Sequence, residues 1–300
     1  MIVINELEKK FENAAALQNV SLTVETGRIM GIVGSNGAGK STLLRCLAGI
    51  YKAEVGTVTV DGIVPYENTE IKGRIYFVPD SPHFEPGATV RSTAKLNAAF
   101  YPGFSWEKFE HLCAAFQLDA NRKIATMSKG MQRQAALIAG LATMPDYLLL
   151  DEVFDGLDPV MRCLLKRIIA GEVADRGMTV LIASHNLREL EDFCDTVGLL
   201  HKGGVLLEKE VDTLRLGMHR LQVVFRDAVA EDDLRSAFDV VSLGYTGSLH
   251  TLVVRGERED IECGLSAFAP VFCEFLPLSL EEVFIQEMEA VGYDFEEIIL

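Results

Sequence analysis

The sequence lacks three features that would each point to a particular class of protein. It has no stretch approaching the ~18 to 20 uninterrupted apolar residues that a membrane-spanning helix needs. Its six cysteines include no C-x-x-C pair, a pattern that suits reduced core thiols better than disulfides or a zinc site. The first residues contain neither the basic region nor the cleavage site of a secretory signal. We therefore expect a cytoplasmic protein without a membrane span of its own.

Basic residues are also scarce relative to acidic ones. The chain carries 28 Lys and Arg against 44 Asp and Glu, a formal net charge of −16. Because nucleic-acid binding depends largely on clustered Lys and Arg, this balance argues against a nucleic-acid partner. Hydrophobic residues make up 49% of the 300 residues, which is enough for one large α/β domain and a smaller second one.

The most informative stretch follows an apolar, strand-like run at residues 29–33. It fills every fixed position of the pattern G-x-x-x-x-G-K-[ST], and a helix-like segment with leucines on one face follows at 41–48. Strand, glycine loop and helix point backbone N–H groups and a helix N-terminus at a polyphosphate. Lys40 would reach the β- and γ-phosphates, and the Ser41 hydroxyl would ligate Mg²⁺. The residues expected to bind nucleotide are Gly34, Ser35, Asn36, Gly37, Ala38, Gly39, Lys40, Ser41 and Thr42.

Two carboxylates end the next landmark, an apolar strand at residues 147–150. Since strand C-termini face the ligand crevice of an open α/β sheet, Asp151 is suited to the Mg²⁺ shell and Glu152 to polarising the attacking water. A further strand ends in His185, which could sense the γ-phosphate, although a lone His is often only a surface or capping residue. The alternative for the acidic pair is a set of solvated acids after a core strand. No N-K-x-D guanine-reading motif occurs, which favours adenine as the base.

The distance between these two motifs is too long for a simple β-α-β unit. The pattern of the intervening segment, roughly residues 85–145, predicts mainly helices, with Ser105 as a helix cap before Trp106. We therefore expect a helical subdomain inserted between the phosphate loop and the acidic strand.

Further landmarks accompany the two motifs along residues 1–212. Phe11 precedes the phosphate loop, and Asp80 follows the strand-like Y-F-V-P. The tetrapeptide S-K-G-M begins at Ser128, and G-L-D ends at Asp158. In this order, and together with the switch-like His185, these residues strongly resemble the ATP-binding subunits of ABC transporters.

The resemblance implies a role for each landmark. Phe11 matches the aromatic position that stacks on adenine, and Asp158 lies in the loop that crosses to a partner subunit. Asp80 stands where the family usually carries a Gln that contacts Mg²⁺ and relays to the permease. The implied catalytic residues are Glu152, His185 and Lys40. The implied metal ligands are Ser41, Asp151 and Asp80.

The signature motif of the family, usually L-S-G-G-Q, is matched by Ser128, Lys129, Gly130 and Met131. A Ser before helix-forming residues is an N-cap, so free N–H groups and a partial positive charge face an anion. In the family this helix end caps the γ-phosphate bound by the opposite subunit, which implies two chains around two ATP molecules. An ordinary helix cap explains Ser128 but not Gly130, since glycine weakens the start of a helix. The S-K-G-M form resembles an exporter subgroup whose permease is a separate polypeptide.

The resemblance thus implies an ABC-type phosphate-loop NTPase, with a mixed sheet core and an inserted helical subdomain. It would use ATP and Mg²⁺, pair with itself or a related subunit, and energise transport, we expect export, through a membrane permease that holds it at the cytoplasmic membrane. Two alternatives stay open. One is a soluble ABC-type ATPase without a permease. The other is a nucleotide-binding regulator with little hydrolysis, motivated by Asp80 and Lys129.

A second unit is expected at residues 213–300, with a role in dimer contact or regulation. Its pattern of strand, helix, strand, strand, helix and strand predicts a ferredoxin-like α+β domain. The expected elements are at 221–225, 231–238, 240–243, 249–254, 260–268 and 271–275, with a last helix at 280–290.

Overall fold

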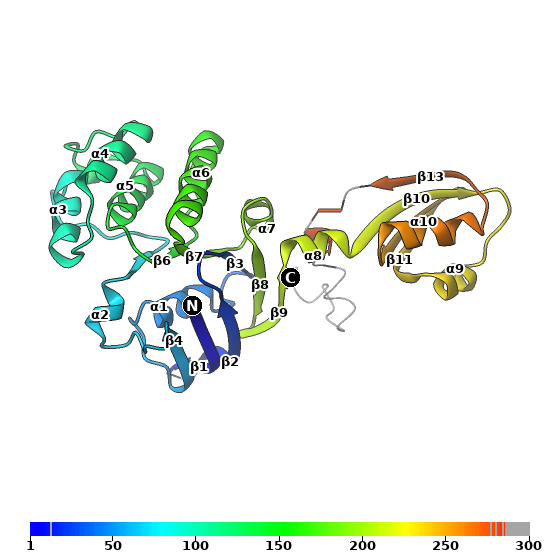
Figure 1. The fold of residues 1–300 in the computed structure, drawn as a ribbon, viewed down its shortest axis with the longest axis horizontal. Helices are drawn as coiled ribbons and strands as arrows, with labels where there is room; N and C mark the ends of the chain where they lie inside the picture. The colour runs from blue at the N-terminus through cyan, green and yellow to red at the C-terminus, as the bar shows by residue number, and fades with distance from the viewer. Residues whose placement is uncertain (13, 277, 280, 284, 286–300) are drawn as a thin grey trace. The chain divides into compact units, whose positions relative to one another are not determined.

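The computed structural model describes all residues except 13, 277, 280, 284 and 286–300, and it does not describe the side chains of 214–216. The chain divides into two compact units, Met1–Glu208 and Lys209–Leu300 (Figure 1). We expected the boundary after residue 212, and the division lies four residues earlier, after Glu208. The expected last helix, at 280–290, lies largely outside the described residues.

The first unit is built on a sheet of six strands whose neighbours in space are far apart in sequence. Its core strands run parallel, with β3 between β7 and β8, and β6 between β5 and β7. Strands buried on both faces are nearly continuous apolar runs, as the fully buried β3 and β6 are. The order is β5 (Ile75–Val78), β6 (Tyr147–Asp151), β7 (Thr179–Ser184), β3 (Ile29–Val33), β8 (Thr196–His201) and β9 (Gly204–Glu210).

A second, antiparallel sheet of three strands packs on the same core. Its order is β2 (Ala14–Val24), β1 (Ile2–Phe11) and β4 (Val55–Val60). Helix α1 (Lys40–Leu47) shares one buried cluster with both sheets, because Leu43, Leu44 and Leu47 are fully buried against Leu17 and Leu149. Burying each leucine contributes about 2 kcal/mol, so this packing holds the helix and the loop before it rigidly in place.

Helices between β5 and β6 form the expected helical subdomain, whose members gather side by side in Figure 1. Ser105 caps its second helix by accepting the backbone N–H of Lys108 at 3.1 Å, as the sequence predicts. Its elements are α3 (Val90–Phe100), α4 (Trp106–Ala115), a 3-10 turn (Ile124–Thr126) and α5 (Lys129–Leu141). The other helices of the first unit are α2 (Thr69–Lys72), α6 (Pro159–Arg176) and α7 (Leu187–Leu190).

The second unit begins with α8 (Val211–Leu216) and has its own four-stranded antiparallel sheet. Its elements are β10 (Met218–Phe225), α9 (Glu231–Ala237), β11 (Asp239–Thr246), β12 (Leu249–Arg255), α10 (Arg258–Ser266) and β13 (Pro270–Leu276). They follow one another in the order expected from the sequence, and the strands lie in the order β11-β12-β10-β13. Leu234 and Ile261 of the two longer helices are buried against Leu221 and Leu252 of the sheet. In the described part of the chain, no helix has the length and apolar character of a membrane span.

Candidate functional site

The glycine loop between β3 and α1 is shaped by contacts that exclude side chains. A Cβ at Gly34 would come within 2.3 Å of the Leu200 carbonyl oxygen. One at Gly39, whose φ is +106°, would come within 2.5 Å of the Ala16 carbonyl oxygen. Only glycine fits such close approaches and left-handed backbone without strain. The loop therefore leads directly into the N-terminus of α1, the geometry that binds phosphate groups.

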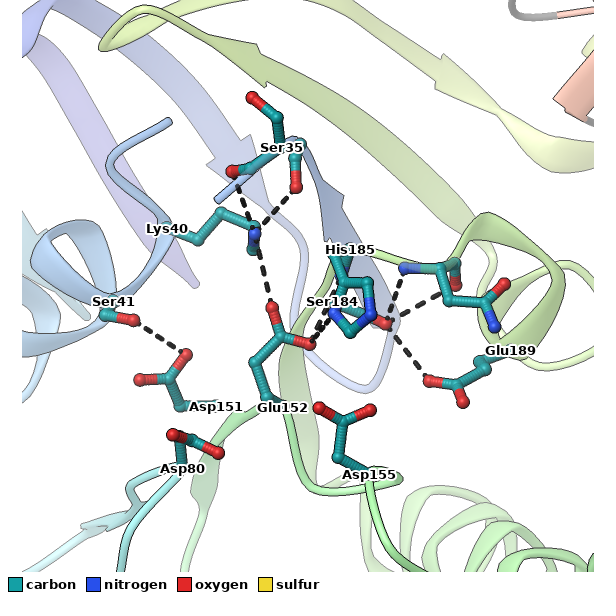
Figure 2. Close-up of polar contacts among 12 residues, drawn as sticks. Ser35, Lys40, Ser41, Asp80, Asp151, Glu152, Asp155, Ser184, His185 and Glu189 are labelled. Atoms are coloured by element: carbon teal, nitrogen blue, oxygen red, sulfur yellow. Dashed lines mark hydrogen bonds and ion pairs between the residues drawn. The ribbon is translucent and has the colours of Figure 1, made fainter. Parts of the chain in front are cut away.

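Lys40, the first residue of α1, is almost completely buried, with 6% of its surface exposed. Its ammonium donates hydrogen bonds to the carbonyl oxygens of Gly34 at 2.6 Å and Ser35 at 3.2 Å. Its Nζ atom also lies 3.2 Å from Oε1 of Glu152 (Figure 2). A buried cation is stable only when hydrogen bonds or an opposite charge compensate for its lost hydration. The opposite charge here belongs to Glu152, the candidate general base.

The carboxyl group of Asp151 is fully buried at the end of β6. Ser41 donates a hydrogen bond from its hydroxyl to Oδ1 at 3.0 Å, while Oδ2 is buried without a hydrogen-bond partner in the described structure. Burial is the main cause that raises the pKa of Asp151, and the hydrogen bond from Ser41 opposes it. A hydroxyl and a carboxylate with a free lone pair are oxygen donors of the kind that Mg²⁺ prefers. These two residues fit the metal expected there.

Glu152 lies between Lys40 and His185 (Figure 2). Its Oε2 accepts a hydrogen bond from the backbone N–H of His185 at 3.2 Å and lies 2.9 Å from Nδ1 of the imidazole. The hydrogen bond between the imidazole and the Glu152 carboxylate is the main cause that raises the pKa of His185. Glu152 and His185 also form, with Asp155, a group whose potential ligand atoms lie within 4.8 Å of one another. Parallel pairing of β6 with β7 brings the two strand ends together.

A pocket lies where these groups meet. Asp80 reaches it from the loop after β5, and Figure 2 shows this residue next to Asp151. The pocket has a volume of about 270 Å³ and is lined by Ala16, Asn36, Gly37, Ala38, Gly39, Lys40, Ser41, Thr42, Asp80 and Glu152.

The carboxylate of Asp80 has a partner that the sequence did not indicate. Its Oδ1 pairs with Nη2 of Arg133, and its backbone oxygen accepts from Nε of the same side chain at 3.1 Å. Arg133 lies on α5, and an arginine on a helix carries no local signal of such a role. The metal contact expected of Asp80 stays a prediction.

Ser128 caps α5 by accepting the backbone N–H of Met131 at 3.3 Å. Ser128 and Lys129 are exposed and do not line the pocket of their own chain. Gly130 has a reason to be glycine within this chain, because a Cβ there would come within 2.6 Å of the Gly156 carbonyl oxygen. The signature helix thus packs directly on the loop that follows Glu152.

The two remaining sequence-predicted residues also lie outside the pocket lining. Asp158 is exposed and caps α6, accepting the N–H groups of Val160 and Met161 at 3.0 Å each. Phe11 is 40% exposed at the end of β1, and its ring meets that of Tyr51 edge-on, with the centroids 5.2 Å apart. The ammonium of Lys9 lies over the same ring, 5.4 Å from its centroid.

Comparison with known proteins assigns the chain to a family. The family model described as "ABC transporter" matches residues 17–155. The ABC transporter ATP-binding protein YtrB of Bacillus subtilis is 30% identical over 288 residues, which span 95% of this chain and 97% of that protein. The Nod factor export ATP-binding protein I of Burkholderia lata is 30% identical and covers 79% of this chain and 81% of its own length.

Solved structures show the same fold. A dimeric structure of MJ0796, a bacterial ABC transporter cassette, is 26% identical and superposes with a TM-score of 0.65, covering 70% of this chain and 99% of the cassette. The same cassette has been solved as a dimer in a post-hydrolysis state with ADP and phosphate, with a TM-score of 0.64 and 26% identity. Both matches leave 30% of this chain outside the superposed part.

The chain therefore belongs to the ABC transporter ATP-binding proteins. It is an ATP-binding subunit with an α/β phosphate-loop fold, and it is an ATPase.

Proposed function

We propose that this chain, as a dimer, binds two ATP·Mg²⁺ and drives export through a separate membrane permease. The observation that carries the proposal is that the phosphate loop, Asp80 and Glu152 line the same pocket. The names of relatives such as the Nod factor export protein support the direction of transport.

Nucleotide binding would exchange one partner of Lys40 for another. The ammonium now lies 3.2 Å from Glu152, and a γ-phosphate, which carries more charge, would compete for it. Glu152 would then keep its contact with His185 and be free to orient water. Gly34 to Thr42 would hold the phosphates through backbone N–H groups, and Phe11 would stack on adenine.

Hydrolysis would follow the usual logic of phosphoryl transfer, in which positioning and charge stabilisation dominate. The water oxygen attacks the γ-phosphorus, the bond to the ADP oxygen breaks, and the water proton passes to Glu152. Ser41 and Asp151 would hold Mg²⁺, which neutralises charge on the phosphate oxygens. Ser128 and Gly130 of the partner subunit would cap the γ-phosphate, and His185 would support it.

The permease would bind the helical subdomain. Its helix α3 exposes two large apolar side chains, Leu96 at 51% and Phe100 at 70%. Next to Leu96 lies a small cavity of about 120 Å³, formed with His83, Phe84 and Glu85 of the loop that starts at Asp80. An apolar patch beside the loop from the nucleotide site fits a partner whose movement must be linked to hydrolysis.

The test measures ATP hydrolysis by the purified chain, with and without Mg²⁺ and with and without membranes that contain the proposed permease. We expect Mg²⁺-dependent hydrolysis that rises with the permease present. Phe100→Asp should abolish the stimulation and leave the basal rate unchanged. Hydrolysis without any membrane stimulation would favour the permease-free ATPase, and binding without hydrolysis would favour the regulator.

A further inference from the structure

Arg133 joins three segments of the first unit that are distant in sequence. It lies one turn into the signature helix α5, and its side chain is 15% exposed. The guanidinium holds both the carboxylate and the backbone oxygen of Asp80 in the loop after β5. Its third donor, Nη1, bonds the backbone oxygen of Asp155 in the turn after β6. A guanidinium can make these contacts together because its five N–H donors form a rigid planar fork.

The pocket edge that Arg133 reaches is rich in acids. Asp80 and Glu152 line the pocket, and Figure 2 shows Asp151 and Asp155 beside them. Glu152 has Lys40 and His185 as partners, and Asp151 has the hydroxyl of Ser41. Asp80 lines the phosphate pocket, so an uncompensated charge on it would face the triphosphate. Arg133 supplies the cation that it needs.

We propose that Arg133 is a positioning residue for ATP hydrolysis that acts through Asp80. It neutralises the charge of this carboxylate, which would otherwise repel the triphosphate. It also fixes the carboxylate at the pocket edge, at a constant position relative to the signature helix and the turn after Glu152. The close packing of Gly130 on Gly156 supports this linkage, because it ties the same helix to the same turn. The inference rests on the proposed placement of ATP·Mg²⁺ in this pocket.

Two variants of Arg133 distinguish the effect of its charge from the effect of its planar, multidentate geometry. Arg133→Gln removes both, so we expect ATP binding in EDTA to weaken about tenfold and kcat to fall about tenfold, the size of one lost charge-assisted contact. Arg133→Lys keeps the charge without the fork. It should bind ATP within about twofold of the parent, yet retain the tenfold loss of kcat.

A double-mutant cycle with Asp80→Asn identifies the partner. In the Asp80→Asn background there is no charge to neutralise, so Arg133→Gln should cost little further ATP affinity. Arg91→Gln is the matched control, because Arg91 pairs with Glu110 on the same helical subdomain, away from the pocket. This control should leave ATP affinity and basal turnover unchanged. Circular dichroism and thermal unfolding establish that each variant is folded.

Two results would overturn the proposal. One is that Arg133→Gln loses the same ATP affinity in the parent background and in the Asp80→Asn background. Arg133 would then only anchor the Asp155 turn. The other is equal kcat in the parent and both Arg133 variants. The placement of ATP is tested separately with the parent and Lys40→Ala. Equal ATP affinity of those two proteins would contradict the proposed nucleotide site, whatever the Arg133 variants do.

Discussion

The ammonium of Lys40 and the carboxylate of Glu152 lie 3.2 Å apart and form an ion pair in the lining of the candidate nucleotide pocket. Both side chains are well buried, with 6% and 12% exposed. The two side chains that we propose to act at the γ-phosphate are therefore paired with each other in the described structure. Under the proposed function, ATP binding breaks this pair and thereby frees Glu152 to orient water when substrate is present.

Glu152→Gln tests this exchange. The amide cannot accept the proton of water, so turnover should fall by about 100-fold or more. ATP should bind at least as tightly as to the parent, because Lys40 no longer has a competing carboxylate. Equilibrium binding, steady-state hydrolysis and gel filtration with ATP, where we expect a trapped dimer, measure these effects. Glu70→Gln, an exposed acid at the start of α2, serves as the control. Near-normal hydrolysis in Glu152→Gln would rule out this residue as the base.

Lys40→Ala should weaken ATP binding itself by about 10- to 100-fold, the range for one charged hydrogen bond. The triphosphate would then meet only backbone dipoles, and Glu152 would repel it. Isothermal titration with ATP measures the change. Lys95→Ala, an exposed lysine on α3, should leave the affinity unchanged. Equal affinities of Lys40→Ala and the parent would mean that the loop is not the nucleotide site.

Phe11→Ala should weaken ATP binding about tenfold, since stacking a base on an aromatic ring contributes about 1 to 3 kcal/mol. Phe11→Trp should retain the affinity, because the indole offers a face of the same kind. Binding of inorganic triphosphate provides the control, since it has no base and should be insensitive to both changes. A parallel loss of triphosphate binding would show that Phe11 supports the fold instead.

Gly130→Ala and Gly171→Ala are helix substitutions with opposite expected outcomes. Alanine favours a helix over glycine by about 1 kcal/mol at either position. At Gly171 on α6 the new Cβ meets nothing within 4 Å, so stability should rise by about that amount. At Gly130 it would come within 2.6 Å of the Gly156 oxygen and displace the turn after Glu152.

Thermal unfolding and ATP turnover measured together separate these effects. We expect Gly130→Ala to lose most of its turnover and to gain no stability. A stabilised and fully active Gly130→Ala protein would contradict the close packing of the signature helix on this turn.

Glu172 on α6 is a buried acid that links two elements, through Lys108 of α4 and Arg176 of its own helix. Burial opposes its ionisation, but the hydrogen bonds from Lys108 and Arg176 outweigh burial and lower its pKa. A lowered pKa stabilises the fold above the unfolded value of 4.5, and this contribution is lost as the pH falls through the folded value.

Glu172→Gln should therefore destabilise the protein by about 2 kcal/mol at pH 7, the scale of a charged hydrogen bond. The difference from the parent should shrink as the pH falls from about 4.5 through the lower folded value, since the unfolded parent takes up a proton before the folded carboxylate does. Denaturant unfolding across this range measures it. Glu110→Gln is the control, because Glu110 is 54% exposed and its ion pair with Arg91 should contribute less than about 1 kcal/mol. Equal loss in both variants at every pH would contradict the role of burial.

The sequence by itself indicated the candidate nucleotide site, because each of its parts is contiguous along the chain. A glycine loop between a strand and a helix, and two acids at the end of a strand, are each defined by residues a few positions apart. The inserted helical subdomain and the Ser105 cap could be predicted for the same reason, since capping and periodicity are local properties. The assignment of each site residue to its catalytic or binding role stays a prediction.

Only the tertiary structure decided which charges meet. Arg133 is 53 positions from Asp80, and no local pattern marks either residue as the partner of the other. Likewise, Gly130 could be explained in the sequence only by a partner subunit, whereas folding brings it against Gly156 of the same chain. Lys40 meets Glu152 because β3 and β6 both pair in parallel with β7, so the chain leaves the two strands at the same edge of the sheet. Such pairings depend on the packing of elements distant in sequence, which short-range patterns do not encode.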